Sequence, residues 1–134
     1  MQVLLSLDFI LTIAANTDII FDTNGYSSTG FSHTPGTAPV IVNIAGVYAL
    51  SFSLLAINLN QIAIFRNGVM IPNSIYGTGT GPSQNNGQVI AQLAAGDQIT
   101  LRVISTAVNP TILVPQGGAF ANVNASILIQ QVSL

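Results

Sequence analysis

The chain has 134 residues, of which only two Arg and four Asp are charged, and its net charge is −2. Hydrophobic residues make up 49% of it, while Lys, Glu, Cys and Trp are absent. Because a typical soluble domain is about one-quarter charged, much of this surface is expected to be hidden against other copies of the chain. The composition favours an obligate oligomer with a structural role and argues against a monomeric enzyme.

The same composition limits the partners. Two Arg residues do not make the basic surface that phosphate binding requires, so no nucleic-acid partner is expected. No apolar run is long enough to cross a bilayer, so membrane insertion is not expected either. Residues 1–15 look like a secretory signal, but they lack a basic start and contain Asp8, so they are predicted to be part of the fold. The absence of Cys leaves the redox compartment open.

Apolar residues alternate with a period of two along most of the chain, which is typical of β-strands. The alternation predicts one continuous strand over residues 3–13 and short strands over 18–21 and 39–43. In residues 47–57, Tyr48, Leu50 and Phe52 form a bulky face, and small residues such as Ser51 occupy the other. Further strands are predicted over residues 61–66, 69–72, 88–94, 98–106, 111–114 and 123–132.

Turn signals such as Asn24-Gly25, Asn67-Gly68 and Asn86-Gly87 separate these runs, and Asn-Gly suits tight hairpins. Residues 77–83 are predicted to be an exposed loop between two strands. Helical spacing is not sustained anywhere. Many short strands divided by turns predict an all-β sandwich or barrel, and the lack of linkers or repeats predicts a single domain over residues 1–134.

Four segments resemble, in the same order, motifs of the tumour-necrosis-factor and complement globular-head superfamily. They are Gly46-Val-Tyr-Ala-Leu-Ser-Phe52, Arg66-Asn-Gly68, Leu93-Ala-Ala-Gly-Asp-Gln-Ile-Thr-Leu101 and Ala125-Ser-Ile-Leu-Ile129. Residues 21–36 fit as well. The chain most resembles the C-terminal domains of bacterial collagen-like spore-surface glycoproteins of the BclA type, with Leu50 replacing a Phe of the motif. No Gly-X-Y repeat precedes these segments, so an excised head or a stand-alone member is expected.

The resemblance implies a ten-strand jelly-roll β-sandwich that assembles as a homotrimer. It further implies a non-enzymatic head domain that drives trimerisation of a collagen-like protein and mediates contact at the extracellular surface, in the spore exosporium. A host-surface protein or a glycan would be its ligand, bound by residues 23–37 and 76–86. The alternative is a trimeric viral or phage fibre knob that binds host glycans, for which Tyr26, Phe31 and Tyr76 are suitably placed in or near predicted loops.

No catalytic, metal or cofactor site is predicted. His33 could be combined with an Asp and a Ser on paper, but a turn histidine is the favoured interpretation, since no Gly-x-Ser-x-Gly motif presents a nucleophile. Asp18 and Asp22 alone offer too few oxygen ligands for calcium unless three subunits pool them. The Gly-rich residues 77–81 are not followed by the Lys of a phosphate-binding loop, and the glycosylation motif at Asn124 is attributed to chance.

One face of the predicted sheet is the candidate for subunit contact. The strands over residues 47–57, 88–94 and 123–132 are expected to share a sheet, with their bulky faces in the core. Their other faces carry small and uncharged residues, as the centres of protein interfaces do. Arg66 and Arg102 are expected to pair with Asp or with backbone carbonyls. The residues predicted to line the trimer interface are Ser51, Ser53, Gln88, Ile90, Gln92, Asn124, Ser126 and Leu128.

Overall fold

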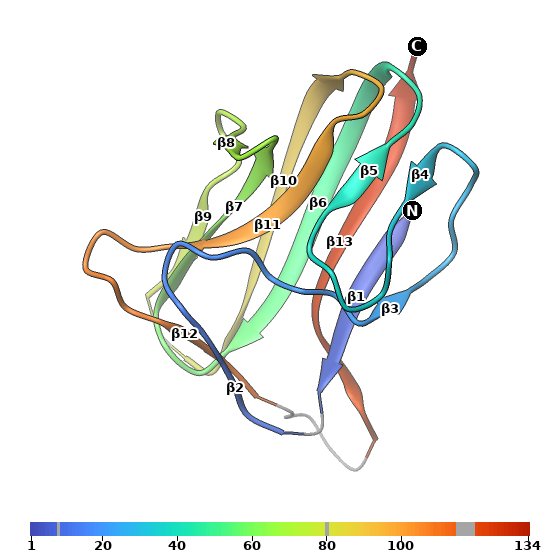
Figure 1. The fold of residues 1–134 in the computed structure, drawn as a ribbon. Helices are drawn as coiled ribbons and strands as arrows, with labels where there is room; N and C mark the ends of the chain where they lie inside the picture. Colours follow the sequence, from blue (N-terminus) through green and yellow to red (C-terminus); the bar gives the residue numbers. More distant parts are fainter. Residues whose placement is uncertain (8, 80, 115–119) are drawn as a thin grey trace.

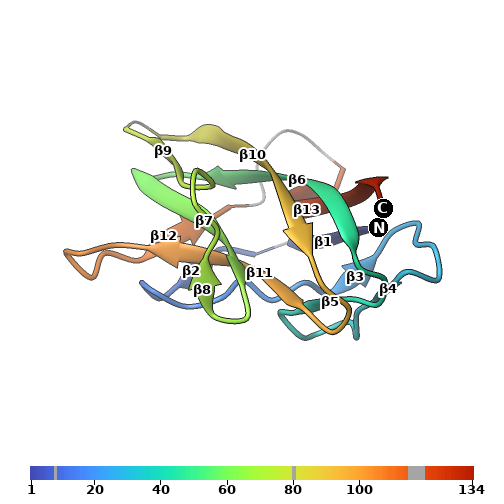
Figure 2. The ribbon, with the colours of Figure 1, turned by 90° about the horizontal axis from the view of Figure 1, so that it is seen from above.

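The computed structural model describes residues 1–7, 9–79, 81–114 and 120–134. These residues form two antiparallel sheets that pack face to face as a sandwich (Figure 1; Figure 2). A seven-stranded sheet has the order β2-β12-β6-β13-β1-β3, with β10 also pairing with β6, and a six-stranded sheet has the order β4-β5-β11-β7-β8, with β9 also pairing with β7. Met1 lies beside Ile129 of β13, to whose carbonyl its amino group donates a hydrogen bond of 2.7 Å, and the C-terminus lies further along at one end of the sandwich (Figure 1).

The strands differ widely in length. Four of them, β6, β10, β11 and β13, supply much of the framework, and several others are only two or three residues long. Short segments of this kind raise the strand count above the ten expected, while the predicted all-β jelly-roll sandwich is confirmed. The bounds are β1 Gln2–Leu7, β2 Leu11–Ile13, β3 Thr23–Asn24, β4 Phe31–Ser32, β5 Val40–Val42, β6 Gly46–Ala56, β7 Asn60–Arg66, β8 Val69–Met70, β9 Tyr76–Thr78, β10 Ser83–Leu93, β11 Gln98–Ile104, β12 Thr111–Leu113 and β13 Asn122–Ser133.

The core lies between the two sheets and is built from the inward-facing residue of each alternating pair. In β6 the bulky face predicted from the sequence, which includes Tyr48, Leu50 and Phe52, is buried. It meets side chains such as Ile64 of β7 and Leu101 of β11 in one hydrophobic cluster. The predicted sharing of a sheet by β6, β10 and β13 is confirmed by their pairing.

The hairpin between β7 and β8 turns at Asn67 and Gly68, as the Asn-Gly signal predicted. Both residues have positive φ angles, 52° and 80°. Two consecutive positive φ angles are what the tightest hairpin turns require, and Asn and Gly reach them most easily.

Three sequence predictions of strands were wrong. The strand expected over residues 3–13 is interrupted, because β1 pairs with β13 whereas β2 pairs with β12. Phe9, which a continuous strand would place on the same face as the buried Leu5 and Leu7, is 56% exposed. Residues 18–21 form only isolated bridges, from Asp18 to Arg102 and from Phe21 to Thr37. Finally, β10 begins at Ser83, so part of the expected loop is strand.

Candidate functional site

The side of the seven-stranded sheet that points away from the core is called here the outer face. On it, β6 lies between β10 and β13, and the strand register places their side chains in rows. Ser51 is opposite Gln88 on one side and Leu128 on the other, and Ser53 is opposite Ser126. The Ser53 hydroxyl donates a hydrogen bond of 2.9 Å to Oε1 of Gln84. The outer face is thus one continuous surface across three strands.

Most of the predicted interface residues lie on this face. Ser51, Ser53 and Ser126 are half-buried, and Gln88 and Gln92 are exposed. Two large apolar side chains are also exposed there, Ile90 at 69% and Leu128 at 47%. These two side chains make the outer face a candidate for contact with another molecule.

The prediction that Asn124 lies on the outer face was wrong. Its side chain is buried, where it accepts a hydrogen bond from the Leu7 N–H at 2.7 Å and donates one to the Val114 carbonyl at 2.6 Å. The cause is a shift in register, since Leu5 pairs with Ala125 whereas Ser6 pairs with Val123. Asn124 is therefore the extra residue of a β-bulge, which turns its side chain into the core. The same burial rules it out as an accessible glycosylation acceptor.

The outer face extends beyond the predicted residues. Leu4 of β1 pairs with Ser126, so β1 continues the surface beyond β13. In β6, Ala49 pairs with both Ile90 and Gln130. The period-two alternation of residues 2–6 and 47–55 was the signal that pointed to these additional positions. In the described part of these strands, no charged side chain lies on the outer face.

The edge of the sheet at β10 is partly closed by two side chains from other strands. The Tyr76 hydroxyl donates to the Gln88 carbonyl at 3.0 Å, and Nη1 of Arg66 donates to the Gln92 carbonyl at 2.9 Å. Unpaired strand edges otherwise invite pairing with another chain. The Arg66 contact agrees with the expected pairing of that residue to a backbone carbonyl.

Gly87 allows Tyr76 to reach this edge. The Tyr76 and Phe52 rings lie edge to face with centroids 6.0 Å apart, and a Cβ at Gly87 would come within 2.3 Å of the Phe52 ring and 2.4 Å of the Tyr76 ring. The absence of a side chain at this position thus permits the aromatic pair. Tyr76 is half-buried in β9, and Asn85 is buried in β10, so residues 76–86 are not the exposed recognition loop that was expected.

The remaining candidate residues hold loops and strands together. The His33 ring contacts Oδ1 of Asn24 through Nδ1 and the Thr37 carbonyl through Nε2, so it joins β3 to a turn, as the turn interpretation predicted. Arg102 forms an ion pair of 2.7 Å with Asp18, which was also expected. Within the described ranges, no three His, Asp, Glu or Cys residues come close enough to hold a metal ion.

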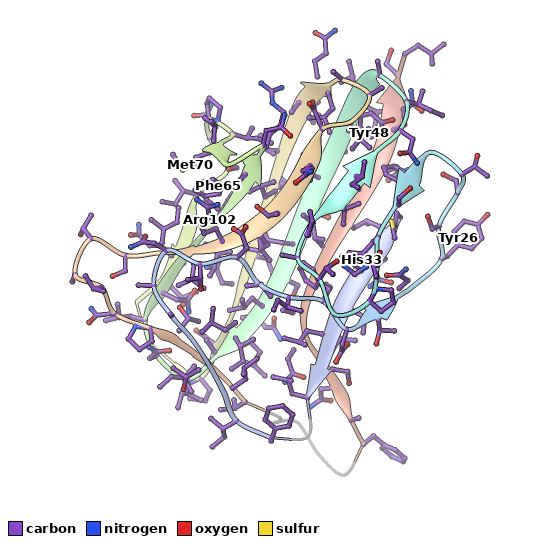
Figure 3. The ribbon with its side chains drawn as sticks, viewed as in Figure 1. Tyr26, His33, Tyr48, Phe65, Met70 and Arg102 are labelled. Carbon is purple, nitrogen blue, oxygen red and sulfur yellow. The ribbon has the colours of Figure 1, made fainter. Side chains whose placement is uncertain are left out.

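One of the aromatic residues expected in loops, Tyr26, is exposed on the surface. Tyr26 is 89% exposed and lies away from Phe65, Met70 and Arg102 (Figure 3). Phe31, also expected to be in a loop, is half-buried in β4 and packs edge to face against Tyr48.

Across the described residues, no helix is long and apolar enough to span a membrane.

Solved structures with the same fold come from two groups of head domains. The Eiger TNF of S. frugiperda superposes with a TM-score of 0.64 at 11% identity, covering 98% of this chain and 90% of that one. The globular domain of zebrafish complement 1qA gives 0.61 at 11% identity, covering 93% and 98%. Murine APRIL gives 0.59 at 14% identity, covering 97% and 99%. At these identities the likeness establishes the fold.

Sequence comparison gives the family. No curated protein sequence matches the chain significantly. Residues 6–133 match the family described as the BclA C-terminal domain, which agrees with the resemblance of the four sequence motifs. This chain therefore belongs to the BclA C-terminal domain family.

Proposed function

We propose that this chain is the trimeric, non-enzymatic head domain of a collagen-like protein of the spore exosporium, and that the outer face forms the threefold contact. The observation that supports the proposal best is the lack of charge on the outer face together with its exposed Ile90 and Leu128. Charge is depleted and apolar area enriched at the centres of subunit interfaces. Covering this face removes that apolar surface from water.

Membership of the family supports two parts of the proposal: the partner is another copy of the chain, and the location is the spore surface. The BclA-type proteins that the sequence resembles assemble as trimers and cap collagen-like stalks on the spore surface. A second copy of the chain presents the same uncharged surface, so neither partner loses the hydration of a charged group when they meet. The proposed roles are therefore to drive trimerisation of the stalk and to mediate contact at the spore surface.

Recognition of an outside partner is assigned to residues 23–37, because residues 76–86 are largely strand. A second candidate function, glycan binding as in a fibre knob, is favoured by a hollow of about 570 Å³ beside Tyr26. Gln2, Gln130, Ser28 and Thr29 line it, and no Asp, Arg or His is among its described lining residues. Uncharged amides and hydroxyls beside an exposed aromatic ring suit a neutral sugar.

The test of the subunit contact is the mass in solution, measured by size-exclusion chromatography with light scattering. We expect a species of about three times the 13.9 kDa chain. Ser53→Glu and Gln92→Glu should each shift it toward monomer, because they place a charge in a desolvated contact. Gln98→Glu, an equal change at an exposed position of the other sheet, should leave the mass unchanged. A trimer that survives both outer-face substitutions would refute the assignment of the interface.

A further inference from the structure

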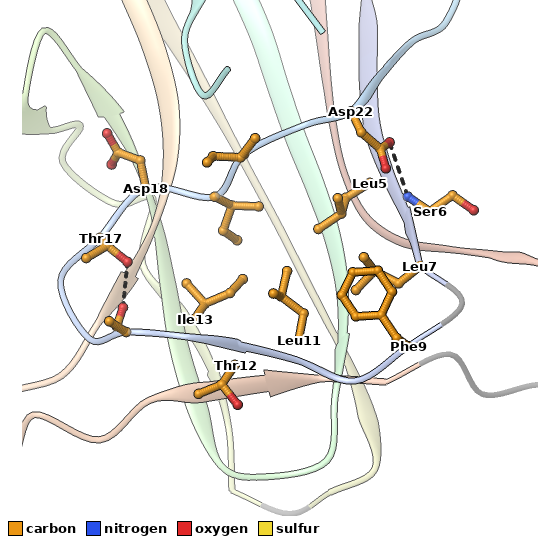
Figure 4. A pocket seen from close by; sticks show the side chains of 13 residues that line it. Leu5, Ser6, Leu7, Phe9, Leu11, Thr12, Ile13, Thr17, Asp18 and Asp22 are labelled. Carbon is orange, nitrogen blue, oxygen red and sulfur yellow. Dashed lines mark hydrogen bonds between the residues drawn. The ribbon is translucent and has the colours of Figure 1, made fainter. Parts of the chain in front are cut away.

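A hollow of about 420 Å³ opens between the two layers of the sandwich, where β1, β2 and residues 17–22 meet (Figure 4). It exists because the chain leaves β1 at Leu7 and re-enters the sheet beside β12 as β2. Residues 17–22 border it on the other side, held to β11 by a hydrogen bond of 2.8 Å from the Ile19 N–H to the Leu101 carbonyl. The hollow is therefore framed by backbone pairing on both sides.

The hollow is distinct from the outer face. Leu5, Leu7 and Ile13 contribute their inward-facing, buried side chains to its lining. A neighbouring copy that covered the outer face would leave this opening accessible, because the opening lies between the sheets. An inference about its occupant thus goes beyond the proposed function and does not depend on the trimer.

Most of the lining is apolar, and the apolar surface continues to the rim. Leu5, Leu11 and Ile13 lie around the space in the close view (Figure 4). Phe9 and Ile20, which also line it, are 56% and 53% exposed. A hollow of this size and character has the dimensions of a small-molecule site, in which apolar walls supply affinity and a few polar groups set orientation.

Two carboxylates line the hollow, and they differ in their partners. Asp18 is neutralised by Arg102 at 2.7 Å. Asp22 is exposed and accepts hydrogen bonds from the Thr23 hydroxyl at 2.9 Å and from the Ser6 N–H at 3.4 Å. Among the residues that the structure describes, no cation lies within ion-pair distance of Asp22. Among the described lining residues, the rim therefore carries one negative charge without a cationic partner, beside an apolar interior.

We propose that this hollow binds a small amphipathic amine, with its apolar body among Leu5, Leu11 and Ile13 and its ammonium group beside Asp22. The walls favour an aromatic or branched aliphatic body over a polar one. The charge of Asp22 favours a cation and opposes an anion of the same shape. The site performs no chemistry on the ligand, because the described lining offers a carboxylate and hydroxyls without a general base paired to a nucleophile.

Three probes test the proposal: tryptamine, tryptophol and indolepropionate, which share an indolylethyl body and end in an ammonium, a hydroxyl and a carboxylate. The chain contains no Trp, so the probe fluorescence and its anisotropy report binding directly. We expect saturable binding of tryptamine, binding of tryptophol about threefold to fivefold weaker, as the loss of one partly exposed ion pair implies, and still weaker binding of indolepropionate. Amide signals of Leu5, Thr12 and Ile19 should shift in the NMR spectrum, and those of Ser53 and Gln88 should not.

The Asp22→Asn variant tests whether probe binding depends on the charge of Asp22 or only on the shape of the hollow. It should bind tryptamine no more tightly than tryptophol, and its unchanged affinity for tryptophol would show that the hollow is intact. Asp97→Asn, which changes the net charge equally at a distant turn, should bind all probes as the unchanged protein does. Absence of saturable tryptamine binding, equal affinities for the three probes, or shifts outside the hollow would overturn the proposal. Concentration-dependent shifts of the same amides without probe would also overturn it, since they would identify a second copy of the chain as the occupant.

Discussion

The two sheets differ in how far their outward-facing apolar side chains are covered by other parts of the chain. On the six-stranded sheet, Ala63 and Phe65 point away from the core, yet they are 0% and 9% exposed. Arg102 covers them: its guanidinium carbon lies 4.0 Å from the centre of the Phe65 ring, and its Nε donates to Asp18. Figure 3 shows Phe65, Met70 and Arg102 gathered on this face. Ala63 and Phe65 are thus covered by the chain itself, although Val69 and Met70 of β8 in the same sheet are 70% and 40% exposed.

The seven-stranded sheet has no such cover. Ile90 and Leu128 stay exposed, and the described part of the face carries no charged residue that could lie over them. Of the two Arg residues in the chain, Arg102 serves the other sheet and Arg66 binds the edge of β10. The difference shows that this chain places its Arg residues on the six-stranded sheet and at the edge of β10, and leaves the outer face, where we propose the subunit contact, without charge.

The largest effect should come from filling the space that lets Tyr76 close the edge of β10. Gly87→Val places side-chain atoms where the Phe52 and Tyr76 rings already lie, at 2.3 and 2.4 Å from a Cβ. We expect the free energy of unfolding to fall by about 3 kcal/mol, as for overpacked cores. Urea denaturation measures it. Gly79→Val is the matched control, because nothing lies within 4 Å of a Cβ there. Equal losses in the two variants would contradict the role given to Gly87.

A smaller effect is expected on the six-stranded sheet. Arg102→Ala uncovers Phe65 and leaves Asp18 without its partner, so the free energy of unfolding should fall by about 1–2 kcal/mol, the sum of a cation–π contact and a partly exposed ion pair. The mass in solution should not change, because the proposed subunit contact lies on the seven-stranded sheet. Thermal unfolding and light scattering check the two statements separately. Dissociation of the oligomer in this variant would remove the distinction between the two faces.

The alternation of apolar residues was sufficient to predict the core face of β6, while its shared sheet with β10 and β13 was implied by the resemblance to jelly-roll head domains. It failed where a strand changes phase or partner. Asn124 is displaced by one bulged residue, and the bulge depends on hydrogen bonds to Leu7 and Val114, which are distant in sequence. Similarly, the pattern over residues 3–13 continues across a gap at which the chain changes from one neighbouring strand to another.

Residues 83–87 show a second limit of prediction from the sequence. Their Asn and Gln content is typical of a loop, and a loop was predicted, but they form the start of β10. The Asn85 side chain is buried because its amide donates to Oδ1 of Asn60 at 2.8 Å and to the Tyr76 carbonyl at 2.9 Å. Polar residues can occupy a buried strand when such partners exist, and those partners are not visible in the local sequence. The hollow between β1 and β2 could not be predicted either, because the strand partners that frame it are also not visible in the local sequence.

The smallest effect concerns a charge that serves neither face. Asp97 lies in the turn that leads from β10 of one sheet to β11 of the other. Burial opposes its ionisation, but the Ala94 N–H, the Asn67 amide and the nearby charge of Arg66 outweigh burial, so the pKa of Asp97 is lowered from its ordinary value. A carboxyl with a lowered pKa in the folded state stabilises the fold above its unfolded pKa, and this contribution is lost as the pH falls through the folded pKa.

Asp97→Asn should therefore reduce stability at about pH 7, and its effect should become smaller as the pH falls below the ordinary pKa of an aspartate toward the lowered pKa of Asp97. The measurement is the difference in free energy of unfolding between the two proteins at each pH. All other groups are the same in the two proteins, so their contributions cancel in that difference. If the difference in free energy of unfolding stays constant over this pH range, the hydrogen bonds of the turn stabilise the fold and the charge of Asp97 does not.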